Sequence, residues 1–152
     1  QGADVTLDLY GAALPKDNAY YEAMVFQIES AKLSQRIVLR GSIPNTAVPI
    51  LYGNREVFVN LTPSGNYDKT VLEAMACGAL PVVSSPAFND AIPPEYRFKE
   101  GDSESLAKTL RNVFSLSEEQ KEEQRLRNRE YVVRQHSMPV LMRAFKEHFA
   151  AL

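Results

Sequence analysis

Two short apolar runs, separated by a polar turn and a helical segment, constrain the fold of this chain most. Residues 57–59 (Val-Phe-Val) and 81–83 (Pro-Val-Val) are continuous apolar runs without polar alternation, as is typical of strands covered on both faces. Between them, turn-forming residues are followed by an apolar helical segment that ends at Gly78. The stretch 57–85 therefore predicts one βαβ unit, and with it a parallel sheet in an α/β fold.

The turn over residues 62–68 lies at the carboxyl end of the first strand and at the amino end of the helix. Ligands of open α/β sheets bind at this edge, because unpaired backbone N–H groups and the positive end of the helix dipole face the crevice. Asp68 is expected to cap the helix. Lys69 and Thr70 follow it, and would place two amides and one ammonium near a diphosphate, or would form a capped helix start with an exposed lysine. Glu73 lies one turn further and would accept hydrogen bonds from sugar hydroxyls, so the set fits a nucleotide sugar.

The order Pro63-Ser64, then LEAMACG over 72–78, then Pro-Val-Val resembles the donor-site signature of the retaining GT-B glycosyltransferases of group 1, the glycogen synthase and sucrose synthase-like enzymes. Glu73 matches the second Glu of that signature. The first Glu of the family falls on Gly65 here, and this departure affects contact with the transferred sugar. The loop over 86–90 also lacks the glycine pair that the family usually has near the donor phosphates.

The resemblance implies the donor-binding, carboxyl-terminal half of a GT-B fold, a Rossmann-like parallel sheet with flanking helices. We expect a single domain over 1–152, with the terminal helices over 117–152 packing back on it. The family's domain begins with a strand and helix whose Arg and Lys hold the diphosphate, and no such unit precedes Val5 in this sequence. The expectation is therefore a fragment of a larger two-domain chain, or a sheet completed by self-association.

Further donor-binding residues follow from the same comparison. Ser64 would either bind the ligand or cap the turn, and Gly65 lies beside it. The strand predicted over 37–41 ends in Gly41, Ser42 and Ile43, where the family's nucleotide base lies against the backbone. No catalytic residue can be assigned from the sequence.

The remaining elements follow from periodicity and caps. We expect a strand over 5–10, helices over 17–33 and 45–52, and a final edge strand over 96–98. Three terminal helices are predicted to begin at Asp102 or Ser103, at Ser117 in a capping box with Gln120, and at Ser137. The charged run 118–130 is interpreted as a solvated face, and the apolar residues over 140–149 as a stripe on the last helix.

Composition excludes several other functions. A formal net charge of −2 provides no basic field for nucleic acid, and no apolar run reaches the roughly 18 residues of a membrane span. The one cysteine, Cys77, excludes an internal disulfide and a cysteine-based metal site, and is interpreted as a core residue. His136 and His148 have no second ligand at metal spacing and are interpreted as surface or helix-end residues. No metal or cofactor is therefore implied.

The sequence also lacks the signature motifs of competing α/β families. Lys69-Thr70 is half of a P-loop motif, but Pro63 and Asp68 occupy its glycine positions. No G-x-G-x-x-G follows a strand, which disfavours a dinucleotide dehydrogenase. A phospho-receiver is disfavoured because residues 60–62 (Asn-Leu-Thr) stand where its Asp should follow a strand.

The resemblance implies a hexosyltransferase that moves a sugar from a nucleoside-diphosphate sugar to an acceptor hydroxyl with retention, in polysaccharide biosynthesis. The acceptor, a glycan or lipid-linked glycan, would be held by an amino-terminal domain, so the isolated chain should be inactive. The expected location is the cytoplasm, or the inner face of the membrane through that domain. The alternative is a non-catalytic α/β assembly or nucleotide-binding module derived from a glycosyltransferase, which Gly65 and the 86–90 loop favour.

Overall fold

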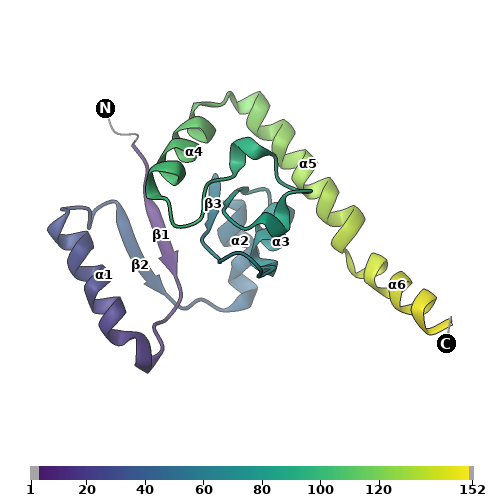
Figure 1. Ribbon diagram of the computed structural model, residues 1–152, viewed down its shortest axis with the longest axis horizontal. Coiled ribbons are helices and arrows are strands. Elements are labelled where there is room, and N and C mark those ends of the chain that lie inside the picture. Colours follow the sequence, from purple (N-terminus) through teal and green to yellow (C-terminus); the bar gives the residue numbers. More distant parts are fainter. Residues whose placement is uncertain (1–3, 151–152) are drawn as a thin grey trace. The chain divides into compact units, whose positions relative to one another are not determined.

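The computed structural model describes residues 4–150, and the chain divides into two compact units, Gln1–Val48 and Pro49–Leu152 (Figure 1). In the first unit β1 (Leu7–Tyr10) pairs in parallel with β2 (Ile37–Gly41), in a register that sets Leu7 against Ile37. The 3₁₀ turn Pro15–Asp17 and helix α1 (Asn18–Ser30) connect them, which confirms the predicted strand–helix–strand order. A second 3₁₀ turn, Asn45–Ala47, follows β2.

The second unit contains the βαβ element predicted from the two apolar runs. Helix α2 (Val48–Gly53) leads into β3 (Val57–Asn60), which pairs in parallel with β4 (Leu80–Val83) through α3 (Lys69–Ala76). All four residues of β4 are buried, whereas the first three of β3 are only half-buried. Burial on both faces is therefore confirmed for β4 and not for β3.

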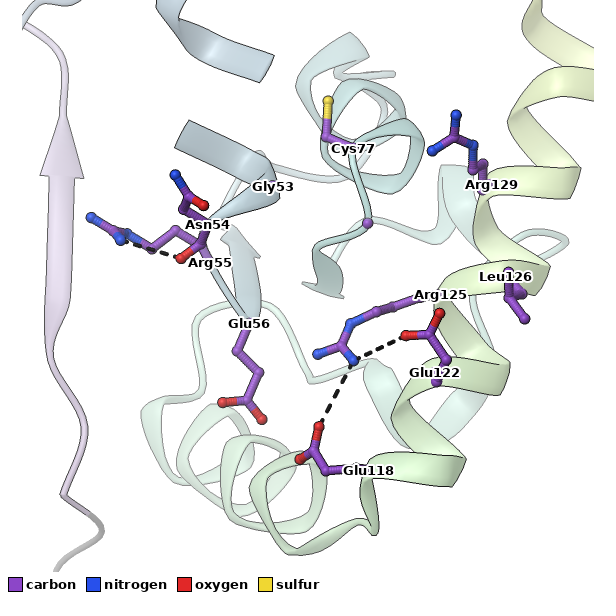
Figure 2. Close-up of a pocket in the computed structure, with 11 residues that line it drawn as sticks. Gly53, Asn54, Arg55, Glu56, Cys77, Glu118, Glu122, Arg125, Leu126 and Arg129 are labelled. Atoms are coloured by element: carbon purple, nitrogen blue, oxygen red, sulfur yellow. Dashed lines mark hydrogen bonds and ion pairs between the residues drawn. The ribbon is translucent and has the colours of Figure 1, made fainter. Parts of the chain in front are cut away.

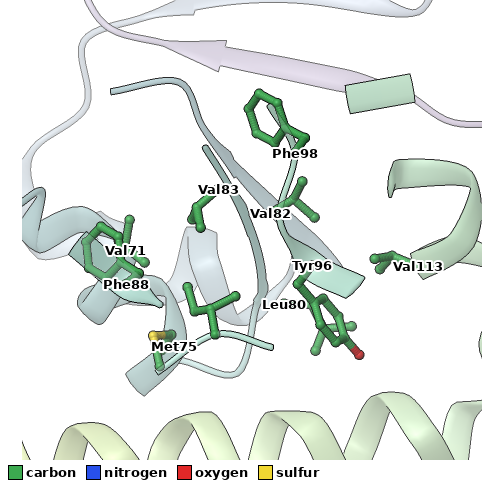
Figure 3. Packing of buried hydrophobic residues seen from close by; sticks show 10 residues of the cluster. Val71, Met75, Leu80, Val82, Val83, Phe88, Tyr96, Phe98 and Val113 are labelled. Carbon is green, nitrogen blue, oxygen red and sulfur yellow. The ribbon is translucent and has the colours of Figure 1, made fainter. Parts of the chain in front are cut away.

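The core of this unit fixes α3 in place (Figure 3). Val71 and Met75 of α3 have no exposed surface and pack with the apolar side chains of β4. Phe88, Ile92 and Val113 close the cluster from later in the chain. Because α3 is anchored from Val71 onward, its amino end lies at the carboxyl end of β3.

The edge strand predicted over 96–98 is wrong. Pro94–Tyr96 forms a 3₁₀ turn, and only Arg97 makes a single parallel bridge, to Val83. Two consecutive prolines, Pro93 and Pro94, fix the backbone φ and remove N–H donors, so a ladder cannot begin there. The aromatic residues that suggested a strand, Tyr96 and Phe98, are instead buried in the core.

Three terminal helices follow, α4 (Ser103–Ser115), α5 (Glu118–His136) and α6 (Met138–Ala150). The Asp102 side chain caps α4 by accepting from the Ser105 amide at 2.9 Å, and Ser117 and Gln120 form the predicted capping box. The apolar side chains of α6 do form a stripe, and they are 47–66% exposed at Met138, Leu141, Met142, Phe145 and Phe149.

The charged run of α5 is more than a solvated face, and this expectation needs correction. Lys121, Gln124 and Asn128 are buried where α5 packs against α3 and β4. They recur at helical spacing and therefore share one face of α5. The Lys121 ammonium lies 2.6 Å from Glu56 and 3.0 Å from Glu118, and Gln124 donates to Asn128 at 2.7 Å. Lys121 and Gln124 each have a partner, which offsets the cost of their burial, whereas Nδ2 of Asn128 is buried without a hydrogen-bond partner among the described residues.

Candidate functional site

The turn after β3 is organised by one carboxylate, Asp68. Its Oδ1 accepts from the Thr70 amide at 2.9 Å and from the Thr70 hydroxyl at 2.7 Å. Its Oδ2 accepts from the Thr62 hydroxyl at 2.8 Å and from Nδ2 of the buried Asn60 at 2.9 Å. The predicted helix cap is confirmed, and the same side chain also joins the end of β3 to the start of α3.

The charge of Asp68 is stabilised within this network. Partial burial acts to raise the pKa of Asp68, but the hydrogen bonds from Thr70, Thr62 and Asn60 together outweigh it, so the pKa lies below its usual value. Asp68 is therefore a carboxylate at neutral pH, and its charge also complements the positive end of the α3 dipole.

The rest of the turn is hydrogen-bonded to two residues later in the chain, Glu100 and Ser85. The Ser64 amide donates to Oε2 of Glu100 at 3.1 Å, and the Ser64 hydroxyl donates to the same oxygen. These two bonds lower the pKa of Glu100. The Ser85 hydroxyl donates to the Asn66 carbonyl at 3.2 Å, and Gly65 adopts φ +92°, a conformation that favours glycine. Ser64, expected to bind a ligand or cap the turn, thus donates to a carboxylate that nothing in the sequence pattern identified.

Lys69 and Glu73 share the open face of α3. Their side chains are 84% and 44% exposed, and Lys69 Nζ lies 3.8 Å from Glu73 Oε1. Exposed ion pairs of this kind contribute little to stability, so a ligand can replace either partner of the pair at a low cost in free energy. Thr70 differs from its neighbour, because its amide and hydroxyl both donate to Asp68.

Tyr52 is a neighbour of this face that no sequence pattern indicates. Burial first, and then the negative charges of Glu73 and Asp68, raise the pKa of Tyr52. The Tyr52 ring also packs edge to face on Phe58, with ring centroids 5.2 Å apart. The sequence carries no signal for this contact, since only the fold brings α2 beside α3.

The predicted base-binding residues belong to the first unit, at the end of β2. Gly41 has φ +68° and its carbonyl accepts from the Gly11 amide at 2.9 Å. Ser42 is exposed and Ile43 is half-buried. Their role toward a base stays a prediction.

A hollow of about 580 Å³ lies at the other end of the two strands (Figure 2). Residues 54–56, which precede β3, and Cys77-Gly78, which precede β4, form one wall, and Arg125 and Arg129 of α5 lie on the other. Glu118 and Glu122 pair with Arg125 across 4.0 and 3.5 Å, so the lining carries both charge signs. This hollow is not the predicted donor site. Cys77 is half-buried in its wall, so its interpretation as a core residue is wrong, because Ala74 and Met75 take the buried positions.

Residues 4–150 contain neither a cluster of metal-ligating side chains nor a membrane-spanning helix. No group of three or more His, Cys, Asp or Glu side chains in this range is placed to hold a metal ion. No helix in the same range has the length and apolarity needed to cross a membrane. Both histidines lie on the surface as predicted, and His136 ends α5.

A model of the family described as "Glycosyl transferases group 1" matches residues 1–115. No curated protein matches the chain. Among solved structures, HepE of Anabaena in complex with UDP is 18% identical, with a TM-score of 0.89 over 99% of this chain and 42% of that one. Sucrose-phosphate synthase from Thermosynechococcus elongatus is 20% identical, with a TM-score of 0.82 over 97% of this chain and 39% of that one.

A third similar structure is the carboxyl-terminal domain of a glycosyl transferase group 1 family protein from Francisella tularensis. It is 18% identical, with a TM-score of 0.75 over 88% of this chain and 70% of that one. The chain thus spans about two fifths of the first two structures. At these identities the likeness is one of fold, and it confirms the predicted Rossmann-like architecture of a GT-B carboxyl-terminal domain.

Proposed function

Because the chain belongs to the group 1 glycosyltransferases, we propose that the segment between β3 and α3, here called the turn 61–68, and the first turn of α3 bind a nucleoside-diphosphate sugar. The sugar would pass to an acceptor hydroxyl with retention of its anomeric configuration. One observation carries the proposal: a turn fixed at both ends by Asp68 presents Lys69 and Glu73, both exposed, at the carboxyl edge of β3. A phosphate needs a cation and a sugar hydroxyl needs an acceptor, and these two side chains supply one of each.

Lys69 would supply the positive charge. As a nucleoside diphosphate leaves, negative charge grows on its phosphate oxygens, and a nearby ammonium and the helix amino end stabilise that charge. The Thr70 amide is used by Asp68, and the Val71 amide donates to the Asp68 carbonyl at 3.2 Å. The Lys69 amide and ammonium are therefore the groups of α3 best placed for a phosphate, and Thr70 acts through Asp68.

Glu73 would hold the ribose hydroxyls. A carboxylate accepts two hydrogen bonds from neighbouring hydroxyls, which fixes the donor relative to the diphosphate site. Tyr52 lies near enough for the negative charge of Glu73 to help raise the pKa of Tyr52. Ser64 and Gly65 would face the sugar side of the same turn.

The nature of the donor and of the acceptor is also proposed. HepE has been crystallised with UDP and with UDP-glucose, so UDP-glucose is the first donor to test. We further propose that an acceptor glycan or lipid-linked glycan is held outside this chain, by an amino-terminal domain of a polysaccharide-synthesising enzyme in the cytoplasm or at the inner membrane face. No metal or cofactor is required by the leaving-group chemistry described above.

Calorimetric titration of UDP, GDP and ADP into the purified protein tests the binding site. We expect saturable binding of one nucleotide, which Glu73→Ala weakens by about 1–3 kcal/mol, the range for a lost hydrogen bond to a charged group. Glu123→Ala is the matched control, because Glu123 is an exposed helix carboxylate that pairs with Arg127 at the same i,i+4 spacing. If no nucleotide binds at millimolar concentration, or both substitutions have equal effects, the proposed site is refuted.

A second candidate function is a nucleotide-binding or assembly module without transfer activity. Gly65 favours it, because a glycine stands where the family carries the carboxylate that contacts the transferred sugar. In a protein that carries this chain together with the amino-terminal domain, release of UDP from UDP-glucose in the presence of candidate acceptors separates the two functions. Transfer with an unchanged anomeric coupling in the proton NMR spectrum of the product supports the transferase, and binding without turnover supports the module.

A further inference from the structure

Four aromatic side chains connect the turn 61–68 to the end of α5. The Tyr67 ring stacks on Phe88, with centroids 4.8 Å apart and an interplanar angle of 29°. The Tyr67 hydroxyl lies 3.1 Å from Nε2 of His136, within hydrogen-bond distance. The His136 ring in turn lies against Tyr131, with centroids 5.3 Å apart. The turn is thus joined to a helix end 69 residues away.

The two ends of this chain of contacts differ in rigidity. Phe88 is 1% exposed and belongs to the core, so it gives Tyr67 a fixed platform. His136 is the last residue of α5, and α6 begins two residues later at Met138. The contact between Tyr67 and His136 therefore links the turn to the residue that precedes the junction of α5 and α6.

Tyr67 lies between two anchored residues of the candidate site. Tyr67 directly precedes Asp68, the residue whose network sets the start of α3, and directly follows Asn66, whose carbonyl is held by Ser85. A displacement of the Tyr67 ring moves the backbone between these two anchors. Lys69 begins α3 directly after Asp68, so the same movement of the backbone would displace the Lys69 amide and ammonium.

We propose that Tyr67 and His136 form a latch that holds the turn 61–68 in its ligand-ready position and couples it to the α5–α6 junction. Neither side chain is required to touch a ligand, so both are positioning residues. Tyr67 is 50% exposed, and water can replace His136 as its partner, so the latch opens at modest cost. The effect on the turn does not depend on the proposed function, whereas the effect on donor affinity rests on it.

Hydrogen exchange of the amides over residues 61–70 tests the latch without any ligand. We expect Tyr67→Phe, which keeps the stacked ring, and His136→Ala each to speed exchange there by about 3–10-fold. The double variant should exchange no faster than either single variant, because both remove the same bond. His136→Gln, which restores a hydrogen-bonding group, should recover much of the protection. His148→Ala, an exposed histidine on α6, is the matched control and should change nothing over 61–70.

UDP titration of the same variants forms the second arm. We expect Tyr67→Phe and His136→Ala to weaken binding by about 3–5-fold and the double variant to show the same loss. Unchanged exchange over 61–70 in both single variants, or additive effects in the double variant, would overturn the latch even if UDP binds. Faster exchange with unchanged UDP affinity would overturn its control of the site. Failure of the unaltered protein to bind any nucleotide refutes the proposed function, while the exchange arm still decides whether the latch exists.

Discussion

Replacing Asp68 with alanine should destabilise the second unit by about 2–3 kcal/mol. Loss of a helix cap costs roughly 1 kcal/mol. The substitution also removes the acceptor of the buried Asn60 amide and of the Thr62 hydroxyl, which adds about 1–2 kcal/mol. The loss should not exceed this range, because Asn60 Nδ2 keeps a second hydrogen bond, to the Thr62 hydroxyl oxygen at 3.2 Å.

Urea unfolding followed by far-UV circular dichroism measures this loss, since the chain contains no tryptophan for a fluorescence probe. Asp102→Ala is the matched control, because Asp102 caps α4 in the same unit by a single bond to the Ser105 amide. We expect the control to lose only the capping contribution of about 1 kcal/mol. Equal losses in the two variants would refute the reasoning that Asp68 holds a network beyond its cap.

The dependence of this effect on pH has a definite sign. The pKa of Asp68 is lowered in the folded state, from a usual value of 3.8. The stabilisation is therefore complete above the unfolded pKa and is lost as the pH falls through the lower folded pKa. The difference in unfolding free energy between the unaltered protein and Asp68→Asn should be constant near neutral pH and should shrink below about pH 4.

Two further substitutions test the structure near the hollow at the other end of β3 and β4, where Gly78 and Glu56 lie. Gly78→Ala should destabilise the protein by about 1 kcal/mol for conformational reasons alone, because Gly78 has φ +89° and an added Cβ meets no atom within 4 Å. Gly53→Ala, at an ordinary φ, is the control and should be close to neutral. Equal effects of the two substitutions in urea unfolding would contradict the conformational explanation. Lys121→Ala should cost about 1–2 kcal/mol, below the usual loss for a broken buried pair, because Glu56 and Glu118 remain 41% and 80% exposed and can hydrate. Lys121→Met, which keeps the buried aliphatic stem, should cost less in the same assay, and a loss equal to that of Lys121→Ala would count against a packing role.

Much of the fold was predictable because its strands and caps follow local rules. Apolar runs without alternation predicted β3 and β4, and Asp68, Asp102 and the Ser117 capping box predicted three helix starts. The predicted edge strand over 96–98 failed because two prolines outweighed β propensity. The buried face of α5 was missed because polarity alone does not say which charged residue finds a partner.

The candidate site was predictable only where its chemistry is local in sequence. Asp68, Lys69, Thr70 and Glu73 lie within six positions, so helical geometry alone placed them together. Glu100, Tyr52 and His136 reach the same region from other parts of the chain. Glu100 does so through two hydrogen bonds from Ser64, and His136 through one contact with Tyr67. Such isolated contacts leave no periodic pattern in a sequence, so these residues required the fold.

The structure also bears on an apparent conflict within the site. A carboxylate beside a diphosphate would repel it, and Asp68 directly precedes Lys69 at the expected diphosphate site. The four donors from Asn60, Thr62 and Thr70 occupy the oxygens of Asp68, so its charge is directed into the protein, while the ammonium of Lys69 remains exposed. If repulsion dominated, Asp68→Ala would tighten UDP binding. Because Asp68 sets the geometry of the turn, we expect the same substitution to weaken it, and the sign of that change decides between charge and positioning as the role of Asp68.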